Sequence, residues 1–125
     1  DQKLWRQVNP RWFDNDVIGE LAFRASGEED YKLSVSQESK VTAQSAYKFH
    51  TEQMARHSAG VPAVTANEVS EVGCRTVDDE TIQEIDPPTP GHAYVDKRGL
   101  NKKQRKEIRE ELADFATVRG LAYRP

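Results

Sequence analysis

The stretch "YKLSVS", residues 31–36, alternates apolar and polar side chains. Because successive side chains of a strand point to opposite faces of a sheet, this period of two predicts a half-buried strand. Leu33 and Val35 should face a hydrophobic core, and Ser34 should lie on the other face. A strand of this kind needs partner strands beside it and a second layer over its apolar face.

Four further stretches have the length and character of partner strands. Residues 3–8, "KLWRQV", predict a strand that ends before Pro10, because proline cannot donate to a strand ladder. A second short strand is expected at about residues 21–24. Later in the chain, "VPAV" at 61–64 is typical of an edge strand or a strand start, and "HAYVD" at 92–96 alternates again.

Two longer stretches carry helical signals. Thr42 is a good N-cap for a helix over residues 42–57. Asn101 and Gln104 have the spacing of a capping box and open a helix over residues 101–119, whose apolar stripe consists of Ile108, Leu112, Phe115 and Ala116. The sequence therefore predicts an α+β fold: a small mixed or antiparallel sheet packed against two main helices, at about 42–57 and 101–119.

The length of 125 residues suits one domain, and we expect residues 1–125 to form it, with a flexible acidic and proline-rich loop at 78–91. With 36% hydrophobic and 31% charged residues, the composition is typical of a soluble protein. No apolar run approaches the roughly 20 residues of a membrane-spanning helix, so no membrane contact is expected. The single cysteine, Cys74, excludes an internal disulfide and a cysteine-based zinc site, and favours a cytoplasmic protein.

Charge is distributed unevenly along the chain. Residues 61–96 carry eight acids and a single base, whereas residues 97–125 carry nine bases and four acids. Such asymmetry is typical of a binding surface, and equally of two segments that neutralise each other. The acidic run Asp78, Asp79 and Glu80 predicts contact with another protein, for which a basic surface is the natural complement.

The segment 97–106, "KRGLNKKQRK", holds six bases and no acid. Lys102, Lys103, Arg105 and Lys106 crowd the first turns of the last predicted helix, which suggests phosphate or nucleic acid as a ligand. Against this, pairs four residues apart screen the charge locally. The sequence pI of about 5.6 is also low for a nucleic-acid-binding protein.

No established catalytic motif occurs: the sequence contains no GxSxG, no P-loop and no dinucleotide-binding glycine pattern. His50 and His57 are seven residues apart, too far for the usual metal pair on a helix, so we expect no metal site and no cofactor. His50 has no acid partner on its own helix, which favours a packed histidine. The alternative is a general base beside Tyr47. For an enzyme, the catalytic candidates are Arg6, Ser34 and His50.

Trp5, Trp12 and Phe13 lie within nine residues of one another, beside two arginines. Core packing accounts for most aromatic side chains of this kind. An exposed cluster of Trp5 and Trp12 would instead mark a protein–protein interface, because tryptophan and arginine dominate interface hot spots.

The order of "LWRQVNP", "AFR", "KLSVS", "TAQSAYKFHTE" and "GVPAVTANEV" resembles a set of short, uncharacterised bacterial proteins with no established activity. A second resemblance is to the ADP-ribosyltransferase toxins, which have an arginine on an early strand and a serine-rich strand. Arg6 in "LWR" and Ser34 in "LSVS" match these two features. Those enzymes also need a late glutamate on a strand, and the sequence departs from them here, because Glu80 and Glu84 fall in a loop-like stretch.

Together these features favour a small cytoplasmic bacterial protein-binding module without catalysis, in an accessory, immunity or antitoxin-like role. The alternative is an enzyme or small-ligand binder with a pocket around Arg6, Tyr47 and His50, for which ADP-ribosyl transfer is one option. A third is phosphate or nucleic-acid binding through residues 97–106. A deep pocket that brings Arg6, Ser34 and His50 together would count against the module, and a flat surface with these residues apart would count against the enzyme.

Overall fold

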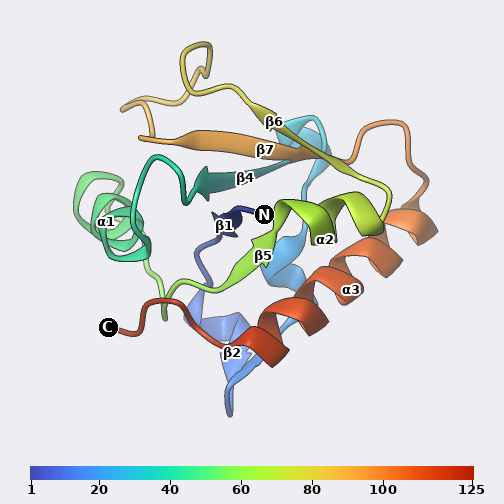
Figure 1. The fold of residues 1–125 in the computed structure, drawn as a ribbon, viewed down its shortest axis with the longest axis horizontal. Coiled ribbons are helices and arrows are strands. Elements are labelled where there is room, and N and C mark those ends of the chain that lie inside the picture. The colour runs from blue at the N-terminus through green and yellow to red at the C-terminus, as the bar shows by residue number, and fades with distance from the viewer.

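The computed structural model describes residues 1–125 and contains a five-stranded antiparallel sheet with helices on both faces (Figure 1). In spatial order the strands are β5 (Ala63–Thr65), β1 (Lys3–Trp5), β4 (Lys32–Gln37), β7 (His92–Asp96) and β6 (Arg75–Asp78). A separate two-stranded sheet consists of β2 (Phe13–Asp14) and β3 (Val17–Ile18). The predicted α+β fold is confirmed, and the main sheet is antiparallel.

β4 is the central strand, and its two faces differ in chemistry. It pairs with β1 on one side and, on the other, with β7, where Ser36 lies opposite His92. Leu33 and Val35 are almost completely buried, as the alternating pattern predicts, whereas Ser34 and Ser36 are half-buried. One face of the sheet therefore belongs to the hydrophobic core, and the other borders a partly enclosed polar region.

The apolar face of the sheet is covered by α3 (Lys102–Arg119) and α2 (Ala66–Glu71), together with a 3-10 turn at Glu20–Phe23. The shared core includes the fully buried side chains of Leu4, Phe23, Leu33, Val69, Val95 and Leu112. Burying a side chain of this size contributes about 1.5–3 kcal/mol. α3 confirms the predicted last helix, and Asn101 and Gln104 make both hydrogen bonds of the capping box.

The opposite face is covered at one end by α1 (Ala43–Lys48), which continues as a π-helical turn at Phe49–Gln53. The helix predicted over residues 42–57 is therefore α-helical over less than half of its length. The Thr51 hydroxyl donates to the Tyr47 carbonyl (3.0 Å), and such a side-chain bond competes with the regular helical ladder. The sequence pattern of apolar residues gives no sign of this local widening.

Two expectations about strands differ from the structure. Residues 21–24 form no strand and overlap the 3-10 turn, because Ala22 and Phe23 are both fully buried beside α3. Neighbouring residues of a strand point to opposite faces, so a strand at this position would need cover on both faces to bury the two side chains, whereas the turn packs both against α3. β6 is the reverse case: it is an edge strand whose residues are exposed or half-buried, and it therefore lacks the apolar alternation that predicts a strand.

Between β6 and β7 the chain forms the loop 79–91, which we call the acidic loop and which extends beyond the ends of both strands (Figure 1). Gln83 closes this loop internally. Its amide nitrogen donates to the carbonyls of Glu80 and Thr89, both at 2.9 Å, and its oxygen accepts from the Thr89 amide at 2.9 Å. The predicted flexibility of the loop stays a prediction.

The longest helix, α3, has 18 residues, and charged side chains occupy much of its length. None of the helices combines the length and the apolar character that crossing a bilayer requires.

Candidate functional site

The half-buried serines of β4 line a cavity of about 270 Å³, which we call the Arg6 cavity. Its wall includes Arg6 just after β1, Ser34 and Ser36 on β4, His50 on the π turn and His92 at the start of β7. Segments far apart in the sequence therefore meet here. The residues that line the cavity include all three predicted catalytic candidates, Arg6, Ser34 and His50.

Arg6 lies where β1 ends and the edge of β4 is left open. Its Nε donates to the carbonyl of Ala22 (2.7 Å) and its NH1 donates to the carbonyl of Ser34 (2.9 Å). These bonds use two of the five N–H donors of the guanidinium, and no carboxylate lies within ion-pair distance of it. Burial lowers the pKa of Arg6 to about 10, so the side chain remains charged at neutral pH. The cavity thus has a fixed positive charge with spare donors.

His50 lies on the π turn, a type of helix distortion that occurs frequently at functional sites. Burial, followed by the positive charge of Arg56, lowers the pKa of His50 to about 4. The imidazole is therefore neutral at pH 7, with one ring nitrogen that can donate a hydrogen bond and one that can accept. Tyr47, the third residue of the predicted pocket, does not line the cavity; its ring packs against that of Tyr123, with centroids 5.0 Å apart.

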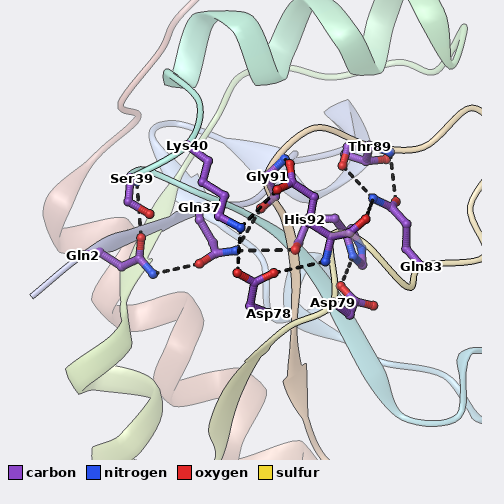
Figure 2. Close-up of polar contacts among 11 residues, drawn as sticks. Gln2, Gln37, Ser39, Lys40, Asp78, Asp79, Gln83, Thr89, Gly91 and His92 are labelled. Carbon is purple, nitrogen blue, oxygen red and sulfur yellow. Dashed lines mark hydrogen bonds and ion pairs between the residues drawn. The ribbon is translucent and has the colours of Figure 1, made fainter.

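The His92 ring forms a hydrogen bond with a carboxylate through Nδ1. Its Nδ1 lies 2.5 Å from Oδ1 of Asp79, the first residue after β6 (Figure 2). An ionised carboxylate can only accept, so Nδ1 is the donor, and in the neutral ring Nε2 then carries the free lone pair. Nε2 is buried and has no hydrogen-bond partner. An orphaned buried acceptor beside a cavity is unusual enough in a folded protein to need an explanation.

Ser36 faces His92 across the β4–β7 ladder. The amide of the next residue, Gln37, donates to the Gly91 carbonyl, so Ser36 and His92 form the intervening pair without mutual hydrogen bonds. Directly opposed side chains approach most closely in pairs of this kind. The Ser36 hydroxyl makes no side-chain hydrogen bond to another protein group. A carboxylate, an imidazole and a hydroxyl therefore lie in one row across β6, β7 and β4.

The acidic residues of the predicted protein-binding surface form ion pairs or hydrogen bonds with side chains of the same chain (Figure 2). Lys40 Nζ lies 2.7 Å from Asp78 Oδ2 and 3.0 Å from Glu80 Oε1, and the second carboxylate oxygen of Glu80 accepts from the Gly91 amide. The hydrogen bond from Lys40 lowers the pKa of Asp78 to about 2. With Asp79 on His92, all three acids of the run have internal partners, and together they fix the start of the acidic loop.

Gln37 supports the other end of the acidic loop. Its amide nitrogen lies 3.4 Å from the Gly91 carbonyl and 3.5 Å from the His92 carbonyl, and its oxygen accepts from the Gln2 side chain at 3.2 Å (Figure 2). Gln37 is itself only 6% exposed. The backbone carbonyls of Gly91 and His92 are therefore hydrogen-bonded to a side chain of the central strand β4.

The other predicted binding residues have mixed outcomes. Trp5 is only 7% exposed and its Nε1 donates to the Val41 carbonyl (2.8 Å), so this residue packs in the interior, as the default interpretation expects, and is not part of an exposed cluster. Trp12 is partly buried against the main core. Of the predicted basic patch, Lys102 and Arg105 line a second cavity, whereas Lys103 and Lys106 do not.

Sequence reasoning missed the roles of Ser36, His92 and Asp79, because only the strand register brings them together. The one usable signal was the position of His92 at the first residue of a predicted strand, directly after the acidic loop. No group of three His, Cys, Asp or Glu side chains lies close enough together to hold a metal ion.

We expect an NMR titration of the His50 ring to give a midpoint near pH 4 rather than the usual 6.5, because burial disfavours the charged ring. Arg56→Gln should raise this midpoint by removing a neighbouring positive charge. Between pH 6.5 and 4 the unfolded chain takes up a proton that the folded protein does not, so the free energy of unfolding should fall as the pH is lowered through this window. The His50→Gln variant identifies the resonance, and a midpoint close to 6.5 would contradict the buried position.

No family model, curated protein or solved structure matches the chain. The two resemblances described above therefore remain predictions, and the site is interpreted from its own geometry and chemistry.

Proposed function

We propose that this protein is an enzyme that acts on a small polar molecule in the Arg6 cavity, with His92 as its general base. The observation that carries the proposal is the buried, unpartnered Nε2 of a histidine whose Nδ1 is fixed by Asp79. A purely structural histidine would be expected to use both ring nitrogens or to leave the free one in water. This one lies in the wall of a cavity that also holds a guanidinium and two serine hydroxyls.

Each side chain has a distinct role in the reaction. Because Nε2 is enclosed, a proton reaches it most directly from a neighbouring side chain, and Ser36 is the hydroxyl across the strand pair. Ser36 Oγ attacks an electrophilic carbon while its proton passes to Nε2, and Asp79 stabilises the imidazolium that forms. The leaving group departs with the electron pair of its bond and receives that proton. Water then releases the acyl group from Ser36 by the same sequence, and Arg6 stabilises the negative charge that develops.

The preferred sequence prediction, a protein-binding module without catalysis, stays untested. It rests on the absence of catalytic motifs and on the charge asymmetry of the sequence. Its expected contact surface was the acidic run Asp78, Asp79 and Glu80, and each of these carboxylates has a partner within the chain. A basic partner protein would therefore have to compete with Lys40 for two of the three. Arg6, Ser34 and His50 line one cavity, and this arrangement supports the enzyme.

A second candidate function is ADP-ribosyl transfer from NAD, which the resemblance to the toxins implies. It is favoured by the contact between Arg6 NH1 and the Ser34 carbonyl (2.9 Å), since the two matched residues meet at one cavity. Of the two late glutamates, Glu84 lines a neighbouring cavity of about 540 Å³ that shares Ser34 and His92 with the Arg6 cavity. Glu80 is engaged by Lys40 and the acidic loop.

The first candidate function is tested with p-nitrophenyl acetate, a small ester with a good leaving group. We expect the protein to release p-nitrophenolate faster than buffer does. His92→Gln should lower kcat/KM by about 100-fold or more, because general-base catalysis contributes roughly 10²–10⁴-fold. Ser36→Ala should cause a comparable loss, and Asp79→Asn should act in the same direction by allowing the wrong tautomer of His92.

The matched control is His57→Gln, which removes an exposed histidine that does not line the cavity and should leave the rate unchanged. Thermal unfolding of each variant separates loss of fold from loss of chemistry. Equal rates for the wild-type protein and His92→Gln would contradict the proposal.

The second candidate function predicts release of nicotinamide from NAD. Glu84→Gln should then lower the rate by at least about tenfold, because the carboxylate would stabilise positive charge that develops on the ribose. Glu71→Gln, an exposed change on α2, serves as the control. Chromatography of the reaction mixture measures nicotinamide directly. Ester hydrolysis without nicotinamide release would exclude ADP-ribosyl transfer and would support the first candidate function.

A further inference from the structure

A second cavity, of about 250 Å³, lies between the first half of α3 and the segment 21–31. We call it the cationic cavity, because five of its ten lining residues are basic and none is acidic: Arg24, Lys97, Lys102, Arg105 and Arg109. The Arg6 cavity takes its lining from other side chains, and no residue lines both. The cationic cavity is therefore a separate site.

Lys97 is the least exposed of these cations. Its side chain is almost completely buried, and Nζ donates to the carbonyl of Phe23. Burial lowers the pKa of Lys97 to about 8, and the positive charges of Arg6, Arg109 and Arg105 act in the same direction. Burying an ammonium without a carboxylate partner is costly. The fold nevertheless holds this group beside the cavity.

Two of the three arginines of the cationic cavity, Arg105 and Arg109, are held by contacts within the chain. Arg105 donates to the Leu100 carbonyl, and its guanidinium lies over the Tyr31 ring, 4.2 Å from the centroid. Arg109 Nε donates to Glu20 Oε2 at 3.2 Å, which is the one ion pair among the five cations. Elsewhere on the protein, dense charge is neutralised locally, as with Lys40 between two carboxylates. The other four cations of the cationic cavity have no ion-pair partner in the chain, so the cavity has an excess of positive charge.

We propose that the cationic cavity binds the phosphate group of a small phosphorylated molecule. Phosphate has several acceptor oxygens and close to two negative charges at neutral pH. Arginine guanidinium groups can contact it with two parallel hydrogen bonds each, and lysine adds a point charge. Lys97 and Arg105 are the more buried side chains of the lining, and Arg24 and Lys102 are its exposed ones. The proposal is independent of the enzymatic function assigned to the Arg6 cavity.

The arrangement favours a small ligand over a nucleic acid strand. The charges converge on one cavity from three parts of the chain rather than forming a row along the surface. Beyond Lys106, α3 becomes acidic, with Glu107, Glu110, Glu111 and Asp114. A phosphate backbone that followed the helix would meet these carboxylates. Lys103 and Lys106, part of the patch predicted from sequence, lie outside the cavity, and Lys106 approaches Glu110 at 3.8 Å.

Isothermal titration calorimetry at low ionic strength tests the proposal, with inorganic phosphate, pyrophosphate and glycerol 3-phosphate as probes. We expect all three to bind, and preference for the ester over free phosphate would identify a phosphorylated molecule as the ligand. The double variant Arg24→Ala/Lys102→Ala should weaken binding by at least about tenfold, because each charged contact to phosphate is worth on the order of tenfold. Both side chains are exposed and have no side-chain partner in the protein, so the fold is retained.

The matched control is Lys48→Ala/Lys103→Ala, which removes the same net charge from exposed positions outside the cavity and should leave the affinity unchanged. Ser36→Ala should also leave it unchanged, which separates this site from the Arg6 cavity. Equal weakening by the two double variants, or no binding of any of the three probes, would overturn the proposal. Binding of a ten-nucleotide thymidine strand in place of the three probes would overturn it as well, and would indicate nucleic acid.

Discussion

The register between β4 and β7 is the constraint on which both the fold and the proposed chemistry depend. With Ser36 opposite His92, the alternation of β4 directs Leu33 and Val35 into the core and both serines to the other face. A slip of one residue would exchange these faces and bury two hydroxyls among apolar side chains. The burial of the core therefore enforces the same register that places Ser36 directly opposite His92.

On the polar face of the sheet, the unpartnered Nε2 of His92 lowers the stability of the fold, and interactions elsewhere in the structure offset this loss. Leaving the buried Nε2 of His92 without a partner is worth about 1–3 kcal/mol of lost stability. The ring stays in place because Asp79 holds it, and because Lys40 ties the residues on either side of Asp79 to the end of the sheet. Local instability of this kind, maintained by surrounding interactions, is typical of functional sites. Segment 21–31 contributes to two cavities of different chemistry, since Glu29 lines the Arg6 cavity and Arg24 lines the cationic cavity.

The elements with a strong local pattern were predicted correctly from the sequence, and these make up most of the fold. Examples are the alternation of β4 and the capping box of α3, both of which depend only on neighbouring residues. The errors fell where tertiary packing decides, as in the 3-10 turn that buries Ala22 and Phe23 together, and in β6, an edge strand with no apolar face. The π turn after α1 depends on a side-chain hydrogen bond that spacing does not reveal.

The candidate site was predicted only in part, for a related reason. Arg6, Ser34 and His50 were recognised by residue type, and a condition for their meeting could be stated, but no local pattern shows which strands are neighbours. Asp79 and His92 are 13 residues apart in the sequence, and Ser36 lies on a third strand. Their proximity can therefore be recognised only once the strand order β4–β7–β6 is known. The acidic run illustrates the same point, because charge alone suggested an external partner for side chains that bind within the chain.

The claim that Asp79 fixes His92 with a free Nε2 is tested most directly by nitrogen-15 NMR of the His92 ring, which distinguishes the two neutral tautomers. We predict that the neutral ring carries its proton on Nδ1 and that Asp79→Asn shifts the population towards the Nε2-protonated form. An Nε2-protonated ring in the wild-type protein, or tautomer populations that do not respond to Asp79→Asn, would contradict this claim.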